Sequence, residues 1–286
     1  MRVVGRLLAV LSLSLAAADL AFAQAWSPDG NRIAFSFFGE NEEVYVVNVN
    51  GTGRVQLTHH PKMDFGPQWS PGGCCLVFLS QRDGNEELYR VGPDGAGLHR
   101  LTNRPSEEGD GHWSPDGKRI VFHSDRTGNM EIFVMNADGT GAVQLTEHDK
   151  KDFSPRFSPD GTQVVFASDR AGDDEIFVMK ADGSEVRQVT RMPGTFEFHP
   201  AWSPDGKKIA FVSKKGPDGD ADIWIINADG TGAANLTSTA TSDEFAPHWS
   251  PDGTRLSFAR YVEGKPPELC IYSLQDSQVR VIAQGP

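Results

Sequence analysis

The sequence predicts an all-β fold, a six-bladed β-propeller built from four-stranded antiparallel blades. Three observations predict it: one unit recurs six times, each copy holds four short runs rich in β-branched and aromatic residues, and 30 glycines and 18 prolines in 286 residues supply many turns. A fixed repeat of roughly 20 to 50 residues indicates stacked equivalent units. One such sheet cannot bury both of its faces alone, so neighbouring sheets must pack together and close around an axis.

The first residues have the order of a secretory signal peptide. Arg2 and Arg6 precede an apolar run over residues 7–18, which is followed by small residues. A basic, then apolar, then small-residue order is typical of export signals, and this run is too short to span a bilayer comfortably. We therefore expect a periplasmic or secreted protein without a transmembrane segment.

Two cleavage sites compete, one after Ala18 and one after Ala23. Phe22 lies at the position where later units carry a phenylalanine before their aromatic residue, so cleavage after Ala18 would keep a packing side chain. We therefore expect a signal peptide over residues 1–18, with residue 23 as the alternative end, and a propeller over residues 19–286.

Each unit begins with an aromatic residue, Ser-Pro and a glycine-containing turn. Four units read Trp-Ser-Pro-Asp-Gly, and the other two read Trp-Ser-Pro-Gly-Gly and Phe-Ser-Pro-Asp-Gly. The aromatic residues, spaced 43, 44, 44, 45 and 47 residues apart, are Trp26, Trp69, Trp113, Phe157, Trp202 and Trp249. This regularity assigns the whole chain after the signal peptide to six units.

Three further strand-like runs follow in each unit. The first runs, which come after the turn, cover residues 32–36, 75–80, 119–124, 163–168, 208–213 and 255–260. The second runs cover residues 44–49, 88–91, 132–136, 176–180, 223–227 and 269–273. The last runs end in Leu-Thr or a related pair at residues 57–58, 101–102, 145–146, 189–190, 236–237 and 281–282. With the segment that carries the aromatic residue, each unit has four strands.

Prolines identify the innermost strand. Pro67, Pro155, Pro200 and Pro247 lie two residues before the aromatic position. Proline cannot donate a ladder hydrogen bond, and the innermost strand of a blade has an edge that faces the central channel. The chain then starts on an inner strand and ends on an outer strand, so the ring must close by packing between the first and sixth blades.

These residues resemble the TolB-type propeller repeat. Its pattern is a proline, any residue, Trp-Ser-Pro-Asp-Gly, a hydrophobic strand, Ser-Asp-Arg, a second strand, an Asp-Gly turn and Leu-Thr. The fourth unit follows the pattern from Pro155 through residues 168–170 and 182–183 to residues 189–190. The third unit nearly follows it, with Gly111 in place of the proline. The resemblance is specific for the fold.

The resemblance also implies a setting in the cell envelope. TolB proteins carry an α/β domain before the propeller and bind the peptidoglycan-associated lipoprotein in the Tol-Pal system. Here the first unit directly follows the signal peptide, so we expect the α/β domain to be absent. The implied partner is another envelope protein, such as a peptidoglycan-associated lipoprotein, and we expect the chain to be a monomer.

The charge of the chain argues against nucleic acid as a partner. Lys and Arg number 27 against 39 Asp and Glu, which gives a formal net charge of −12. Such a chain repels nucleic acid and anionic membranes, and it favours cations or basic partner surfaces.

The turns sort onto two faces, because antiparallel strands alternate in direction. The short uniform turns share one face, and the variable loops at residues 214–222 and 263–267 share the other. Variable loops on a rigid scaffold often carry function, so we expect a ligand on that second face.

The second face carries an acidic residue five positions before the aromatic residue in the second to sixth units. These acids are Asp64, Glu108, Asp152, Glu197 and Glu244. One interpretation is a carboxylate ring at the channel mouth that binds Ca²⁺ or a basic partner. The other is that the acids pair with Arg82, Arg126, Arg170 or backbone N–H groups and tie the blades together.

Three histidines are candidate metal ligands. His112 and His248 directly precede their aromatic residues, and His199 lies three residues before Trp202. Histidine binds transition metals, and the resemblance extends to oligogalacturonide lyases that use propeller histidines with a metal. The simpler interpretation is solvent-exposed or hydrogen-bonded histidines without a metal.

Motifs of the common enzyme classes do not occur. The sequence has no Gly-x-Ser-x-Gly elbow, no His-Glu-x-x-His and no phosphate loop, and Cys74, Cys75 and Cys270 form no disulfide pattern. We therefore predict a non-catalytic scaffold that binds another protein, with no catalytic residue and no cofactor besides the Ca²⁺ considered above. The alternatives are a metal-dependent enzyme like the oligogalacturonide lyases and a propeller that binds a glycan or small ligand.

Overall fold

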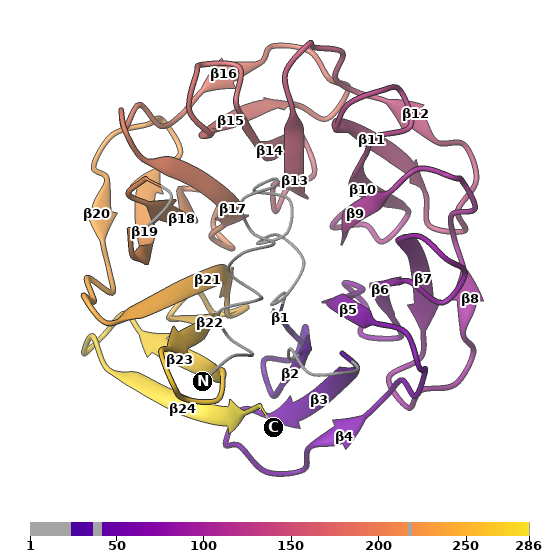
Figure 1. The fold of residues 1–286 in the computed structure, drawn as a ribbon, viewed down its shortest axis with the longest axis horizontal. Helices are drawn as coiled ribbons and strands as arrows, with labels where there is room; N and C mark the ends of the chain where they lie inside the picture. The colour runs from indigo at the N-terminus through magenta and orange to yellow at the C-terminus, as the bar shows by residue number, and fades with distance from the viewer. Residues whose placement is uncertain (1–23, 37–41, 217–218, 286) are drawn as a thin grey trace.

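The computed structural model describes residues 24–36, 42–216 and 219–285. These residues form six four-stranded sheets arranged around a central channel (Figure 1). In every sheet the strands follow chain order from the channel to the rim, and all neighbours are antiparallel. The predicted six-bladed propeller is therefore confirmed.

The strand bounds follow the predicted runs closely. Blade 1 contains β1 (Gln24–Trp26), β2 (Arg32–Ser36), β3 (Val44–Asn48) and β4 (Val55–Gln56). Blade 2 contains β5 (Asp64–Trp69), β6 (Leu76–Ser80), β7 (Glu87–Val91) and β8 (His99–Arg100). Blade 3 contains β9 (Glu108–Trp113), β10 (Arg119–Ser124), β11 (Glu131–Asn136) and β12 (Val143–Gln144).

The remaining blades repeat this order. Blade 4 contains β13 (Asp152–Phe157), β14 (Gln163–Ser168), β15 (Glu175–Lys180) and β16 (Arg187–Gln188). Blade 5 contains β17 (Phe196–Trp202), β18 (Lys208–Lys214), β19 (Ala221–Asn227) and β20 (Ala234–Asn235). Blade 6 contains β21 (Ser242–Trp249), β22 (Arg255–Val262), β23 (Glu268–Ser273) and β24 (Val279–Gln284).

The inner strands bulge where the sequence places its prolines. The register of β5, β9, β13, β17 and β21 against the next strand shifts within this stretch. The residue three positions before the aromatic has a positive φ in each of them: Gly66, Asp110, Ser154, His199 and Ala246. A bulge interrupts the ladder, so a proline there costs no hydrogen bond. This confirms the inner position of the proline-bearing strands.

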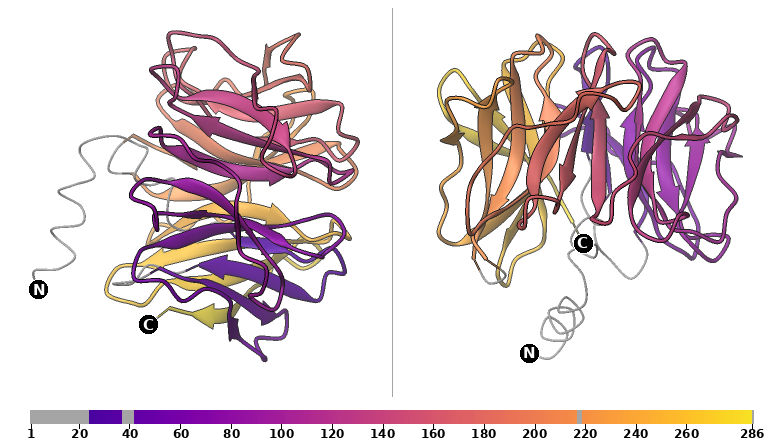
Figure 2. Two further views of the ribbon diagram at one scale, coloured as in Figure 1. Left: turned by 90° about the vertical axis from the view of Figure 1, so that its right-hand side faces the viewer. Right: turned by 90° about the horizontal axis from the view of Figure 1, so that it is seen from above.

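The core lies between adjacent blades. The second strand of each blade carries one phenylalanine that is at most 1% exposed: Phe35, Phe78, Phe122, Phe166, Phe211 and Phe258. The apolar clusters cross from blade to blade, as where Ala34 and Val46 of blade 1 pack with Leu76 of blade 2. Burying a large apolar side chain contributes about 1.5 to 3 kcal/mol, so these interfaces hold the blades side by side in the ring (Figure 2).

The ring closes between blades 1 and 6 without a shared strand, as expected. Ile33 of blade 1 packs in one cluster with Ile271 and Ile282 of blade 6. Trp26 Nε1 donates to the carbonyl of His248 at 3.2 Å. Packing and a few hydrogen bonds therefore join the first blade to the last.

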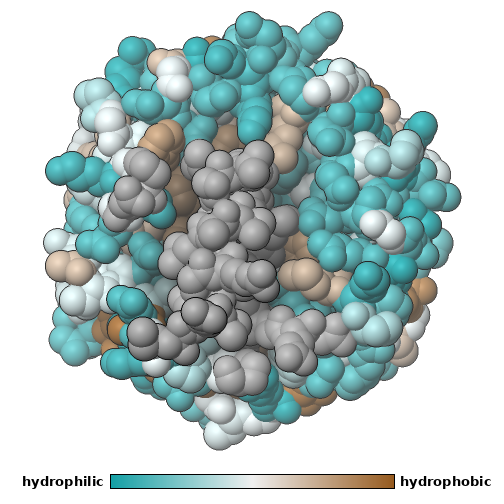
Figure 3. Space-filling model, viewed as in Figure 1, coloured by the Kyte–Doolittle hydropathy of each residue, from teal (hydrophilic) through white to brown (hydrophobic). Residues whose placement is uncertain are grey.

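The face of the ring seen in Figure 3 is mostly hydrophilic outside its centre. Among the described residues no helix is long and apolar enough to cross a membrane. Cys74, Cys75 and Cys270 are all free thiols. The expected signal peptide, both cleavage sites and Phe22 lie outside the described residues.

Candidate functional site

The five acids proposed for the channel mouth are buried in the protein. Asp64, Glu108, Asp152, Glu197 and Glu244 are each at most 1% exposed. Arg82 donates to Asp64 at 2.7 Å, Arg126 donates to Glu108, and Arg170 donates to Asp152. These are the arginines that the sequence suggested as partners, although each pair lies within one blade rather than between two.

The other two acids accept hydrogen bonds from hydroxyl groups. Ser213 Oγ donates to Glu197 at 2.8 Å, and Ser242 Oγ donates to Glu244 at 2.5 Å. Burial, reinforced by the neighbouring carboxyl of Glu175, raises the pKa of Glu197 to about 8. None of the five acids lines the central cavity, so a cation-binding role for them stays a prediction.

A second set of acids was missed by the sequence analysis. It lies at the start of the third strand of every blade, either among the first two residues of the strand or directly before it, and consists of Glu43, Glu87, Glu131, Glu175, Asp222 and Glu268. Glu131 accepts a hydrogen bond from Thr146 Oγ1 at 2.6 Å and another from the backbone N–H of His148 at 2.7 Å. This acid thus fixes the loop after the outer strand. An acid at one constant position in all six copies was the available signal.

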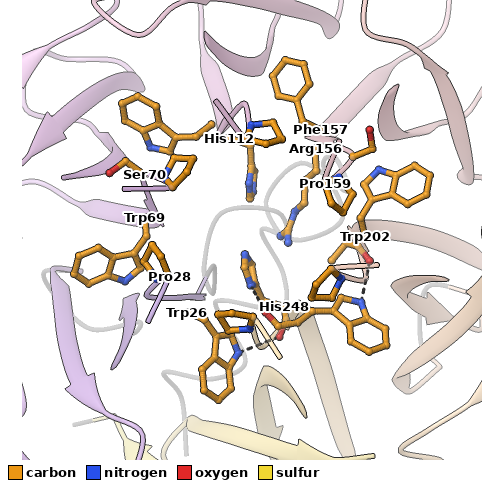
Figure 4. A pocket seen from close by; sticks show the side chains of 18 residues that line it. Trp26, Pro28, Trp69, Ser70, His112, Arg156, Phe157, Pro159, Trp202 and His248 are labelled. Atoms are coloured by element: carbon orange, nitrogen blue, oxygen red, sulfur yellow. Dashed lines mark hydrogen bonds between the residues drawn. The ribbon is translucent and has the colours of Figure 1, made fainter. Parts of the chain in front are cut away.

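A cavity of about 360 Å³ occupies the channel at the end where the Ser-Pro turns lie. One proline from each blade lines it: Pro28, Pro71, Pro115, Pro159, Pro204 and Pro251. In Figure 4 His112, Arg156 and His248 point into its centre, whereas Trp26 and Trp202 point away from it. The cavity lies on the face of the short turns, not on the loop-bearing face where the sequence analysis expected a ligand.

The three polar side chains come from equivalent positions. Each residue directly precedes the aromatic residue of its inner strand, a position that holds Ala25, Gln68 or Ala201 in the other blades. Blades 3 and 6 are three places apart in a ring of six, so His112 and His248 face each other. Their ring centroids are 6.4 Å apart and their planes differ by 18°.

Arg156 supplies a fixed positive charge beside this pair. Burial lowers its pKa to about 10, and the Asp110 carboxylate opposes that shift, so the guanidinium is charged at neutral pH. Within the described residues it donates one hydrogen bond, from NH1 to the carbonyl of Pro247 at 3.4 Å.

Both histidines are neutral at that pH. Burial and the charge of Arg156 lower the pKa of His248 to about 3, and the same causes, joined by His248, hold the pKa of His112 well below its usual range. His248 Nδ1 lies 3.2 Å from the carbonyl oxygen of Trp249. A carbonyl can only accept, so Nδ1 carries the proton and Nε2 is left as an acceptor.

His199 does not join the pair. It occupies the bulge of β17 with a φ of 50°, is 5% exposed, and its ring packs edge-on against Phe198 at 5.0 Å. Across residues 24–36, 42–216 and 219–285 there is no group of three or more His, Cys, Asp or Glu side chains placed to hold a metal ion. The structure thus brings together two of the three histidines considered as ligands.

Blade 3 departs from the repeat next to Arg156. Gly109 replaces the usual phenylalanine, and a Cβ at that position would lie 2.0 Å from His123 Nε2, so the missing side chain makes room for the imidazole. Asp110 Oδ2 lies 3.8 Å from His123 Nδ1 and accepts a hydrogen bond from Ser154 Oγ at 2.8 Å. Asp110 is therefore engaged by its own neighbours.

These three residues are not a nucleophilic triad. In such a triad the hydroxyl donates to the histidine and the acid holds the other ring nitrogen. Here the hydroxyl of Ser154 donates to Asp110 directly, and His123 Nδ1 accepts from the backbone N–H of Ser154 at 3.4 Å. The arrangement therefore gives no activated hydroxyl.

Comparison with known proteins agrees with the fold. A family model described as the TolB beta propeller domain matches residues 12–121 and 100–197. A protein assigned as TolB from Agrobacterium tumefaciens is 26% identical, with 81% of this chain and 86% of that chain covered and a TM-score of 0.70. TolB from Acinetobacter baumannii is 22% identical, with 96% and 66% covered and a TM-score of 0.73.

Propellers with other functions are also similar. An oligogalacturonate lyase in complex with manganese is 18% identical, with 92% of this chain and 76% of that chain covered and a TM-score of 0.64. A puromycin hydrolase is 17% identical, with 94% and 46% covered and a TM-score of 0.63. At these identities the likeness shows a shared fold and nothing about activity.

Proposed function

Because this chain belongs to the TolB β-propeller family, we propose that it is a non-catalytic scaffold that binds another protein of the cell envelope. A peptidoglycan-associated lipoprotein is the partner we propose, by analogy with the Tol-Pal system. The proposal includes export by the N-terminal signal and action in the periplasm, where such a partner would be met.

One observation carries the proposal: the proline rim of the cavity. A protein with a net charge of −12 that gathers six prolines around one concave site offers an apolar docking surface there. Neighbouring turns of the rim also lie side by side, since a Cβ built on Gly73 would lie 3.7 Å from Pro28, and one built on Gly253 would lie 3.7 Å from Pro204. The ring of proline fixes its own φ, so a surface of prolines loses little conformational entropy when it binds.

The test is a direct binding measurement. The mature chain is immobilised, and the purified peptidoglycan-associated lipoprotein of the same organism is passed over it. Pro71→Lys places a charge on the rim. The neighbouring turn leaves room for the new side chain, because even a Cβ built on Gly117 would lie 3.9 Å from Pro71. We expect this variant to bind about tenfold more weakly or worse.

Val143→Lys is the matched control, because Val143 is 58% exposed on the outer strand β12, away from the channel. It should bind like the wild type. Absence of any complex would reject the lipoprotein as partner, and equal binding by Pro71→Lys would reject the rim as the docking surface.

A metal-dependent lyase is the second candidate, and the facing imidazoles of His112 and His248 favour it. Arg156 works against it, because the positive charge that lowers the pKa of both histidines also repels a metal ion. Incubation with Mn²⁺ and oligogalacturonate tests this candidate. Release of unsaturated oligosaccharides that stops in His112→Ala and His248→Ala would replace the scaffold proposal.

A further inference from the structure

We propose that the floor of the central cavity is a binding site for a small organic carboxylate, held by Arg156 and oriented by His112 and His248. The proposal concerns a small molecule inside the channel. It therefore goes beyond the protein-binding role and does not depend on it.

The hydrogen bonding of Arg156 is the first argument. A guanidinium has five N–H donors and no acceptor. Arg82, Arg126 and Arg170 each donate to a carboxylate, whereas Arg156 donates to the described residues only once, at 3.4 Å, to a backbone carbonyl. Its remaining donors converge on the cavity in Figure 4, where a carboxylate could accept two of them side by side.

Among the described residues, no acid forms an ion pair with Arg156. Asp110 raises the pKa of Arg156 through space, but its Oδ2 is engaged by Ser154 and His123. A desolvated cation without a bonded counter-ion is unfavourable. An anion that enters the cavity would therefore form the ion pair and hydrogen bonds with Arg156 that the protein itself does not supply. Asp110 thus keeps Arg156 charged without occupying the place of the ligand.

The histidine pair selects an anion over a metal and adds a second contact. Both rings are neutral beside a permanent positive charge, which disfavours a cation between them. His248 Nε2 is an acceptor, because Nδ1 donates to Trp249. A ligand that carries a hydroxyl or N–H group next to its carboxylate satisfies both Arg156 and this nitrogen.

The size and walls of the cavity limit the rest of the ligand. A volume of about 360 Å³ lies near the lower end of the roughly 300 to 1,000 Å³ that small-molecule pockets occupy. The proline ring around it favours an apolar body. The floor also breaks the sixfold symmetry, since three of the six equivalent positions carry Arg or His and the others carry Ala or Gln. A purely structural role would not require such a difference.

The experiment uses isothermal titration calorimetry of the mature chain with mandelate, which combines a carboxylate, a neighbouring hydroxyl and an apolar ring. Mandelamide has the same shape without the charge, and phenylacetate lacks the hydroxyl. We expect mandelate to bind, mandelamide to bind about tenfold more weakly or worse, and phenylacetate to fall between them. Inorganic phosphate should bind more weakly than mandelate, because it leaves the proline walls unfilled.

Arg156→Gln should weaken mandelate binding about tenfold or more and should not discriminate mandelate from mandelamide. Arg187→Gln is the matched control, since Arg187 is exposed on β16 and donates to the carbonyl of Ala228. If Arg156→Gln fails to fold, the contrast between mandelate and mandelamide on the wild type still decides.

Three results would overturn the proposal. They are equal affinity for mandelate and mandelamide, no heat from mandelate at millimolar concentration, and mandelate binding that requires added Mn²⁺. The outcome is distinguishable from that of the partner experiment, because binding of the lipoprotein neither requires nor excludes an anion in the channel.

Discussion

Arg82 offers the sharpest test of why the acids of the inner strands are buried. Its guanidinium donates to Asp64 at 2.7 Å, and the Asp64 side chain is fully closed to solvent while that of Arg82 is 14% exposed. The guanidinium carbon also lies 4.8 Å from the ring centroid of Tyr89. The substitution Arg82→Met keeps the apolar stem, removes the charge and leaves Asp64 as a buried carboxylate without its partner.

The magnitude follows from these contacts. Removing one member of a buried ion pair costs about 3 to 5 kcal/mol, because the other charge stays desolvated. Loss of the cation–π contact adds about 0.5 to 1 kcal/mol. We therefore expect the free energy of unfolding to fall by about 3.5 to 6 kcal/mol. For a chain of this size the melting temperature should fall by roughly 7 to 24 °C.

The assay is guanidinium chloride denaturation at neutral pH, followed by tryptophan fluorescence. Arg119→Met is the control, because Arg119 lies 5.2 Å from the Phe157 ring centroid but forms no ion pair with a described residue. Arg119→Met should lower the free energy of unfolding by about 1 kcal/mol or less. The double change Arg82→Met with Asp64→Leu should recover most of the loss, since both charges are gone. If Arg82→Met lowers the free energy of unfolding no more than the control does, the ion-pair reasoning is wrong.

Three further predictions concern single positions. The pKa of Glu197 is raised to about 8 from an ordinary 4.5, so its contribution to stability is complete below about pH 4.5 and lost as the pH rises through 8. Glu197→Gln should reduce the fall in unfolding free energy across that window, and identical pH profiles of wild type and variant would contradict the shift. Ile282 is 7% exposed in the cluster between blades 1 and 6, so Ile282→Ala should cost about 2 to 5 kcal/mol in a denaturant titration. Val281→Ala, at a position 37% exposed, should change little, and equal costs would argue against closure by packing. Gly109→Ala should lower the melting temperature, because its Cβ would meet His123 Nε2 at 2.0 Å, and adding His123→Ala should restore it; no rescue by the second change would refute the steric explanation.

Much of the fold could be predicted because its signals repeat. The strand after each turn was placed within a residue of its observed start in all six blades, since an apolar run bounded by Asp-Gly leaves little freedom. The inner position of the first strand was indicated by Pro67 and its equivalents, because proline cannot donate a ladder hydrogen bond. The bulge at these prolines was not predicted.

The site was harder to predict, because it depends on which blades face each other. His112 and His248 are far apart in the sequence, and only a sixfold ring places the third unit opposite the sixth. Arg156 looked like any other residue of the repeat, since a charge in the channel cannot be told from one on the surface by spacing alone. The environment of the five acids was left between two interpretations for a related reason. Whether such an acid meets an arginine or hydroxyl of its own blade, or faces the channel, depends on the side of the strand to which it points, and spacing alone does not give that side.

The closure of the ring has a consequence for engineering. Because β1 to β4 and β21 to β24 form separate four-stranded sheets, no strand ladder among the described residues crosses the junction between blades 1 and 6. The six junctions between blades are therefore alike: apolar side chains pack across each one. A loop connects the two blades at five of them, and the two ends of the ring meet at the sixth. Circularly permuted chains that begin at β5, β9 or any later inner strand should assemble the same ring once the old ends are joined by a linker, so the order of the blades along the gene is free to vary while their order in space is not.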